Sequence, residues 1–258
     1  MTIEKLTTSI ESANARRYSE IAHRYAADWR GKVDQEQQQV LDKFLSLLGK
    51  GKKMILDAGC GTGKASVYFA QKGHRVVSLD LAEGMLKQTM KSSDEQGIVV
   101  EPIRGNMRSI SLADSSLDGI WNVASLVHIP KEMRVEVVSE FHRVLRPEGI
   151  LHIGVQNFLN SKHIKRVLQS YLWFLGYDSA GQFYTKPKSF KEIFEGRPIL
   201  ERIREGYAYL DDRHWFYPTK QELVALLREH DFRILDANGI FERRISLFAI
   251  KQSYETME

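Results

Sequence analysis

Short apolar runs alternate with helical stretches over the middle of the chain. The runs with the length and near-continuous apolar character of buried strands are 54–58, 75–80, 98–103, 118–123 and 150–155. Between them, the spacing of apolar residues predicts helices over about 62–72, 82–95 and 131–145. Strands that are apolar on both faces and alternate with helices are typical of a parallel sheet with right-handed crossovers. The pattern therefore predicts an α/β fold with a doubly wound, Rossmann-like sheet as its core, over 51–156.

Helical spacing also precedes this core. Apolar residues recur every third or fourth position between Tyr18 and Leu48, in two stripes that are separated near Gly31. We therefore expect two helices there, and we interpret residues 1–50 as an N-terminal helical lid.

A helix and two strands are predicted after residue 218. Thr219 and Glu222 have the spacing of a capping box at the start of a helix. The segments 231–240 and 243–251 then predict a closing strand pair. Together with the five strands of the core, this C-terminal part (218–258) predicts a seven-stranded, mostly parallel sheet.

Residues 157–217 interrupt the alternation and hold more than half of the chain's aromatic residues. Sixty residues are too many for a connection without secondary structure, so we interpret this segment as an inserted helical cap. These aromatic side chains suggest either an apolar or flat acceptor or the hydrophobic core of the cap itself, and we expect the second to account for most of them.

Composition excludes several classes of protein. A net charge of +4 is too small to predict binding of nucleic acid. Cys60 is the single cysteine, so an internal disulfide or a thiolate metal cluster cannot form. We find no convincing metal-ligand spacing, no apolar run of the roughly 18 residues that a membrane span needs, and no signal peptide. We therefore expect a cytoplasmic protein without a metal site.

The most specific segment is ILDAGCGTGK, residues 55–64. Gly59, Gly61 and Gly63 follow a predicted strand that carries Asp57 two residues before the first glycine. The nicotinamide-dinucleotide fingerprint is G-x-G-x-x-G, which is one residue longer. A loop that binds only an anion has no need of the carboxylate, whereas a ligand with an ammonium and a sulfonium group does.

This segment resembles the first motif of the class I S-adenosylmethionine-dependent methyltransferases, and the resemblance extends over roughly residues 50–155 and, more weakly, 213–251. Asp80 ends the second predicted strand, where the family's acid binds both ribose hydroxyls. Asn106 stands where an aspartate is usual, and Glu148 stands where a glycine is commoner. We expect Cys60 to offer its backbone amide and to pack as a small side chain rather than to react.

The resemblance implies S-adenosylmethionine as the cofactor and S-adenosylhomocysteine as its product. The residues that it places around the cofactor are Tyr18, Tyr25, Asp57, Gly59, Cys60, Gly61, Asp80, Leu81, Met85, Asn106, Met107, Asn122, Val123 and His128. Tyr18 and Tyr25 resemble the Y-D-x-x-A-x-x-Y entry of small methyltransferases, although helix packing explains Tyr25 equally well.

Methyl transfer needs a deprotonated acceptor, so a general base is required where the acceptor is not already nucleophilic. His128 is the candidate base on the core, since it follows the fourth predicted strand. The alternative is that His128 stacks on the cofactor or orders its loop. His214 either lines the acceptor pocket or is a satisfied residue near the start of the last helix.

The acceptor itself is not determined by the sequence. An inserted cap favours a small-molecule acceptor. Since no metal-ligand spacing is found, we expect metal-independent transfer, and methyl transfer from a sulfonium is an in-line displacement. The alternative enzyme is an RNA, especially tRNA, methyltransferase, for which a basic surface would come from Lys162, His163, Lys165, Arg166, Lys186, Lys188 and Lys191. A non-catalytic cofactor-binding protein is the alternative from another class, and a nicotinamide oxidoreductase is disfavoured by the loop length. The oligomeric state is not readable.

Overall fold

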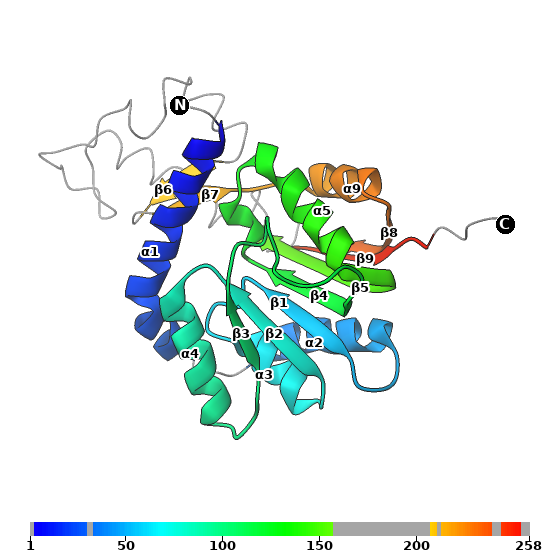
Figure 1. Ribbon diagram of the computed structural model, residues 1–258, viewed down its shortest axis with the longest axis horizontal. Coiled ribbons are helices and arrows are strands. Elements are labelled where there is room, and N and C mark those ends of the chain that lie inside the picture. Colours follow the sequence, from blue (N-terminus) through cyan, green and yellow to red (C-terminus); the bar gives the residue numbers. More distant parts are fainter. Residues whose placement is uncertain (1–2, 30–32, 157–206, 211–212, 239–243, 254–258) are drawn as a thin grey trace, which may run out of the picture.

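The core is a seven-stranded sheet in the order β3-β2-β1-β4-β5-β9-β8 (Figure 1). The computed structural model describes residues 3–29, 33–156, 207–210, 213–238 and 244–253. The strands of the sheet are β1 Met54–Ala58, β2 Arg75–Asp80, β3 Glu101–Arg104, β4 Leu117–Val123, β5 Leu145–Gln156, β8 Phe232–Asn238 and β9 Arg244–Lys251. The first five run parallel, and β9 pairs antiparallel with both β5 and β8. The predicted seven-stranded, mostly parallel sheet is confirmed.

Helices cover both faces of the sheet, as the alternation predicts. On one face, α2 (Gln35–Leu48) and α3 (Lys64–Gln71) pack Phe44 and Phe69 against Trp121 of β4. On the other face, α5 (Arg134–Val144) and α9 (Lys220–Glu229) pack Phe141 and Leu227 over β4 and β5. Helices packed on both faces in this way fix the carboxyl ends of the strands relative to one another.

The local signals for element ends hold in most places. Gly49 ends α2 with a positive φ of 75°, and the Thr219–Glu222 capping box is present at the start of α9. Glu148 has a φ of +61°, a left-handed conformation that explains why glycine is commoner there. β3 begins later than the predicted 98, because the Ile98 amide bonds to the Ser93 carbonyl beyond the end of α4 (Glu83–Asp94).

The helix α1 (Ile3–Trp29) is much longer than the sequence predicts, since it begins fifteen residues before Tyr18. Its early turns bury Ile10, Glu11 and Asn14. Polar side chains on the buried face interrupt the apolar stripe, which hides this part of the helix from a hydrophobic pattern. Gly31, the predicted separator of α1 from α2, lies outside the described residues.

The lid helix α1 lies across α4 at one edge of the sheet (Figure 1). Gly84 of α4 permits this close crossing, because a Cβ atom there would lie 2.4 Å from the Ser19 carbonyl oxygen. The Gly84 amide also donates to Ser19 Oγ at 3.2 Å. These contacts seat α1 on the core, whereas α2, the other helix of the predicted lid, packs on the face of the sheet.

The end of the predicted helical cap is a β-hairpin. β6 (Tyr207–Leu210) pairs antiparallel with β7 (Arg213–Phe216), where the sequence predicts helix. The rest of the predicted cap, 157–206, lies outside the described residues. β7 contacts α1 and the short 3-10 helix η1 (Leu126–His128), so the hairpin joins the lid to the loop after β4.

Candidate active site

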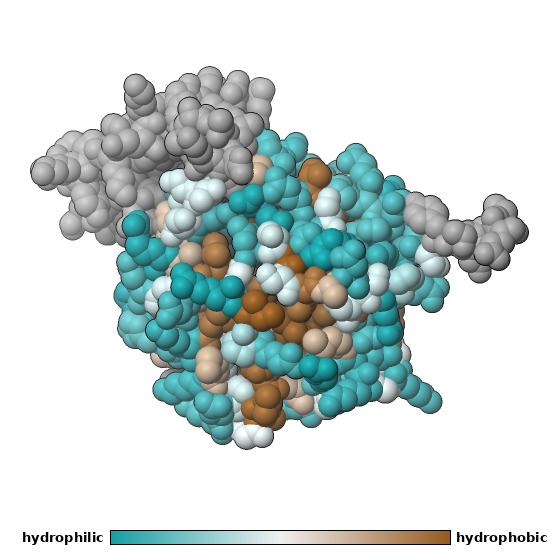
Figure 2. Space-filling view, viewed as in Figure 1, coloured by the Kyte–Doolittle hydropathy of each residue, from teal (hydrophilic) through white to brown (hydrophobic). Residues whose placement is uncertain are grey.

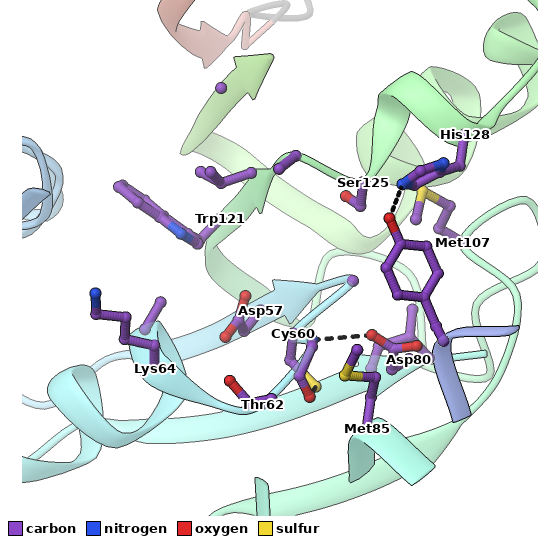
Figure 3. A pocket seen from close by; sticks show the side chains of 18 of the residues that line it. Asp57, Cys60, Thr62, Lys64, Asp80, Met85, Met107, Trp121, Ser125 and His128 are labelled. Atoms are coloured by element: carbon purple, nitrogen blue, oxygen red, sulfur yellow. Dashed lines mark hydrogen bonds between the residues drawn. The ribbon is translucent and has the colours of Figure 1, made fainter. Parts of the chain in front are cut away.

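A cavity of about 600 Å³ lies at the carboxyl ends of β1, β2 and β4 (Figure 3). Ligands of doubly wound sheets bind at this edge, near the point where the strand order reverses. The reversal here is between β1 and β4, whose connections leave in opposite directions. The lid helix α1 closes the cavity from the side, with Tyr18 and Tyr25 in its lining.

The glycine loop between β1 and α3 forms one wall of the cavity. Gly59 has a φ of +77°, and a Cβ atom there would lie 2.3 Å from the Ser125 Cβ. The Gly59 and Cys60 amides both donate to the Leu79 carbonyl, at 2.7 and 3.0 Å. The expectation that Cys60 offers its amide to a ligand is therefore wrong, since this amide ties the loop to β2.

Cys60 does pack as a small side chain. It is buried, with Sγ 3.6 Å from Thr89 Oγ1 of α4. Burial, helped by the nearby Asp80 and Asp57, raises the pKa of the Cys60 thiol well above its usual value. The thiolate is the reactive form, so Cys60 is no nucleophile.

Asp57 is the buried acid at the base of the loop. Its side chain is 3% exposed, and its Oδ2 accepts hydrogen bonds from the Ser66 amide (3.0 Å) and hydroxyl (2.6 Å). Burial is the main reason that the pKa of Asp57 rises from 3.8 to about 7, against the lowering effect of the two bonds from Ser66. A positive group in the cavity would be needed to hold this carboxylate fully ionised at neutral pH.

Asp80 ends β2 beside the loop (Figure 3). Its two oxygens accept from the Ala82 amide (2.8 Å) and the Gly61 amide (2.9 Å), and burial raises the pKa of this carboxyl. A carboxylate offers about four lone-pair sites, so about two of them are left for a ligand. Leu81 and Met85 line the cavity on the side of α4.

Asn106, after β3, has partners in the chain that the sequence does not predict. Its Nδ2 donates to Glu11 Oε2 of α1 (2.9 Å), and its Oδ1 accepts from the Arg108 amide (3.0 Å). Glu11 is 6% exposed and also bonds to the Arg108 guanidinium, at 2.7 and 2.8 Å. Asn106 and Met107 still line the cavity, but Asn106 fastens the lid as well.

Tyr18 and His128 meet in the lining of the cavity. Tyr18 Oη lies 2.9 Å from His128 Nε2, and His128 Nδ1 lies 2.7 Å from the His214 carbonyl oxygen. A carbonyl oxygen can only accept, so Nδ1 carries the hydrogen, and Nε2 of the neutral ring accepts from the Tyr18 hydroxyl. Tyr25 packs edge-on against Tyr18, with ring centroids 5.9 Å apart.

Two predicted site residues lie away from the cavity wall. Asn122 is fully buried and donates to the Ala58 carbonyl (3.0 Å) and to Ser125 Oγ (2.7 Å), so it supports the loop from beneath. His214 is absent from the lining described here, and it contacts His128 through its backbone carbonyl. The structure therefore places the His214 main chain beside the candidate base.

The lining of the cavity extends past Val123 to a part, formed largely by β5 and β9, that the sequence does not predict. We call it the β5 lobe, and its lining includes Trp121, Val123, His152, Gly154, Gln156, Arg244 and Ser246. His152 is 1% exposed, stacks on Trp121 with ring centroids 4.1 Å apart, and has its pKa lowered to about 3 by burial. Its Nε2 lies 2.9 Å from Ser246 Oγ. Lys64 and Gln37 bond to each other at the side of this lobe.

The parts of the chain that the structure describes contain neither a cluster of metal ligands nor a helix that could span a membrane. Within those ranges, no three His, Cys, Asp or Glu side chains are grouped so that they could hold a metal ion. Within the same ranges, no helix has the length and apolar character for crossing a membrane.

Comparison with known proteins agrees with this geometry. Residues 55–149 match the family described as a methyltransferase domain. The malonyl-[acyl-carrier protein] O-methyltransferase of Hamiltonella defensa is 35% identical over 147 residues, which are 55% of this chain and 53% of that protein. The putative methyltransferase YqeM of Bacillus subtilis is 36% identical over 115 residues, 43% of this chain and 45% of its own. The chain thus spans about half the length of these curated relatives.

Solved structures share the fold over most of the chain. The 1,6-didemethyltoxoflavin-N1-methyltransferase of Burkholderia thailandensis superposes with a TM-score of 0.62 at 18% identity, covering 93% of this chain and 87% of its own. The PH0226 protein of Pyrococcus horikoshii gives a TM-score of 0.60 at 20% identity, covering 85% and 92%. The matched domain, the sheet order and the glycine-loop cleft agree, so residues 55–149 are identified as a methyltransferase domain of the class I, S-adenosylmethionine-dependent type.

Proposed function

We propose that this protein transfers a methyl group from S-adenosylmethionine to a small-molecule acceptor that loses a proton in the reaction. The observation that carries the proposal is one continuous cavity, in which the glycine loop and Asp80 lie at one side and the Tyr18–His128 pair at another. A cofactor cleft and a candidate base therefore open onto the same space.

The residues of the cleft fit this cofactor. Gly59 lets the loop pass close against Ser125, where a Cβ atom would clash, and Asp80 keeps acceptor sites for ribose hydroxyls. Leu81 and Met85 offer apolar surface for a flat base, and Asp57 offers a negative group to a cation. When bound, S-adenosylmethionine supplies a methyl carbon on a cationic sulfur that leaves with the bonding electron pair.

The Tyr18–His128 pair can take up the acceptor's proton. Tyr18 Oη can accept it while the hydroxyl's own proton passes along the hydrogen bond, 2.9 Å between Oη and Nε2, to His128 Nε2. The resulting imidazolium keeps its Nδ1–H bond to the His214 carbonyl oxygen. The pair therefore favours an acceptor with an O–H or N–H group at the methylated atom.

A carboxylate acceptor is the second candidate, because several curated relatives are named as malonyl-[acyl-carrier protein] O-methyltransferases. An ionised carboxylate has no proton to lose, so the Tyr18–His128 pair would then only shape the site. The two candidates differ in a measurable way, since only the first depends on the Tyr18 hydroxyl.

Enclosure by α1 and the β5 lobe favours a compact acceptor over a polymer. The basic residues that would support the RNA alternative lie in 157–206, outside the described residues. A protein that binds the cofactor without catalysis would bind it equally well, so transfer must be measured as well as binding.

The test has two arms. In the first, thermal melting is recorded with S-adenosylmethionine, S-adenosylhomocysteine, NAD and NADP, because a ligand that binds only the folded state raises the midpoint. At a concentration of 100 Kd the gain is about 2.7 kcal/mol, or roughly 5–10 °C for a chain of this size. Stabilisation by the two adenosyl ligands alone is expected. Stabilisation by NAD or NADP instead would overturn the cofactor assignment.

In the second arm, tritiated methyl transfer is measured against a panel of phenols, ring N–H heterocycles, amines, malonyl thioesters and tRNA. We expect transfer to an O–H or N–H acceptor that falls at least a hundredfold in Tyr18→Phe. Transfer to the malonyl thioester that survives Tyr18→Phe would establish the carboxylate candidate. Transfer to tRNA alone would contradict a small-molecule acceptor.

A further inference from the structure

A closed ring of hydrogen bonds links the lid, the hairpin and the loop after β4. Asn14 of α1 bonds to the backbone of His214 in β7. The carbonyl oxygen of His214 accepts from His128 of η1, and His128 in turn bonds to Tyr18 of α1. The helix α1 itself closes the ring. Asn14 and Tyr18 are four residues apart and so lie on one face of the helix. The same helix face therefore contacts both ends of the His214–His128 link.

Asn14 satisfies the backbone of His214 on both sides. Asn14 Oδ1 accepts from the His214 amide at 2.8 Å, and Asn14 Nδ2 donates to the His214 carbonyl at 3.2 Å. Only a side-chain amide offers a donor and an acceptor in this arrangement. β7 is the edge of a two-stranded sheet, so Asn14 supplies the bonds that a further strand would supply.

The carbonyl that Asn14 holds determines which nitrogen of His128 carries the hydrogen. A neutral imidazole has one N–H and one lone pair, and the bond made by one nitrogen sets the role of the other. At 2.7 Å from the His214 oxygen, Nδ1 must be the donor. Nε2 is then left with the lone pair that faces Tyr18 Oη.

We propose that Asn14 is a positioning residue, which fixes the His214 carbonyl and thereby the Nδ1–H tautomer of His128. Asn14 is 5% exposed, so its amide is buried beside the pair rather than in solvent. Asn14 belongs to the ring of hydrogen bonds and, like Tyr18, also lines the cavity. The inference rests on the proposed function, since it assigns a purpose to the lone pair of Nε2.

The alternative is that Asn14 only anchors α1. A matched control separates the two, because Ile10 lies one turn earlier on α1 and is equally buried, at 5% exposure. Ile10→Ala loosens the helix through lost apolar packing and leaves the ring of hydrogen bonds intact. Asn14→Ala removes both bonds to His214. Asn14→Asp keeps the size and the acceptor for the His214 amide, but sets a second oxygen against the His214 carbonyl.

The measurement is the ¹⁵N–¹H spectrum of histidine-labelled full-length protein with S-adenosylhomocysteine, in which the protonated and unprotonated ring nitrogens are distinguished. His128→Gln identifies the His128 signals. We expect the Nδ1–H tautomer in the unsubstituted protein and in Ile10→Ala, and a mixture or the opposite tautomer in Asn14→Ala and Asn14→Asp. S-adenosylhomocysteine affinity is expected to change less than threefold in the Asn14 variants.

Retention of the Nδ1–H tautomer in both Asn14 variants would overturn the proposal. The same is true if Ile10→Ala shifts the tautomer as much as they do. The spectrum does not require methyl transfer, so failure of the proposed function is recognised separately, by the acceptor panel. Where an acceptor is available, the Asn14 variants should lower kcat at least tenfold with little change in the KM for the cofactor.

Discussion

Asp57 combines deep burial with a titration close to neutral pH. Its pKa is about 7 in the folded protein, against an ordinary 3.8. Between about pH 4 and pH 7, the folded protein therefore keeps Asp57 protonated, whereas the unfolded chain has already lost this proton. The free energy of unfolding therefore falls as the pH rises through this interval. At about 1.4 kcal/mol per pKa unit, the ionised carboxylate costs the ligand-free fold on the order of 4 kcal/mol at pH 8.

Asp57→Asn should remove this cost and reveal what the carboxylate is for. The amide oxygen can still accept both bonds from Ser66, so we expect a higher melting temperature than the unsubstituted protein at pH 8 and a similar one at pH 4. If the carboxylate holds the ligand's ammonium group, calorimetry should show affinity for S-adenosylhomocysteine rising roughly tenfold from pH 5.5 to 7.5. The rise should be absent in Asp57→Asn. A pH-independent affinity in the unsubstituted protein would contradict the role of Asp57 toward a cation.

At the scale of elements, the lid α1 is fastened to the core by a nearly buried ion pair. Arg108 bonds to Glu11 through Nε (2.7 Å) and Nη2 (2.8 Å), and to Glu136 of α5 through Nη1 (2.7 Å). These bonds raise the pKa of the Arg108 guanidinium, with Glu11 as the larger cause. Within the described residues, removal of Arg108 would leave the buried Glu11 carboxylate with the Asn106 amide as its side-chain donor, which is costly for a charged group.

Arg108→Ala is therefore expected to loosen the lid. We expect a loss of about 2–4 kcal/mol in the free energy of unfolding, faster amide exchange in residues 10–25, and release of S-adenosylhomocysteine at least fivefold faster. Hydrogen exchange and stopped-flow displacement measure these effects. The control is Lys87→Ala, because the exposed pair of Lys87 with Glu83 contributes at most about 1 kcal/mol. Equal release rates in Arg108→Ala and Lys87→Ala would show that α1 is not a lid.

Elements with a regular period were predictable from the sequence, and those with a mixed face were not. The strand that ends at Asp80 and the capping box at Thr219 follow from local rules, and both stand where predicted. The first turns of α1 were missed because Glu11 and Asn14 occupy its buried face and mask the apolar period. The hairpin was missed because all of 157–217 was interpreted as a helical cap on account of its length, although Tyr207 and Tyr209 alternate with the period of a strand.

At the scale of the whole molecule, the site contains two kinds of residues. Local sequence motifs place the first kind, and the register between paired strands places the second. The loop glycines and Asp80 are close in sequence and could be placed beforehand. The β5 lobe depends on pairing across the sheet, where Gly154 lies between Val123 of β4 and Ser246 of β9. Residues more than ninety positions apart meet there, and no local pattern reports such a register. Figure 2 shows one face of the assembled molecule, where apolar residues gather between polar ones over the sheet and its helices.

The β5 lobe also gives a test of where the acceptor binds. A Cβ atom on Gly154 would lie 3.0 Å from Val123 Cγ2 and 3.3 Å from His152 Cε1, so any side chain there projects into the lobe. Gly154→Ala should lower kcat/KM for the acceptor several-fold, and Gly154→Val more than tenfold, because the larger group fills more of the space. Affinity for S-adenosylhomocysteine, measured by calorimetry, should stay within twofold, since the glycine loop and Asp80 lie elsewhere in the cavity. A parallel loss of cofactor affinity would assign the lobe to the cofactor instead, and unchanged transfer in both variants would place the acceptor outside it.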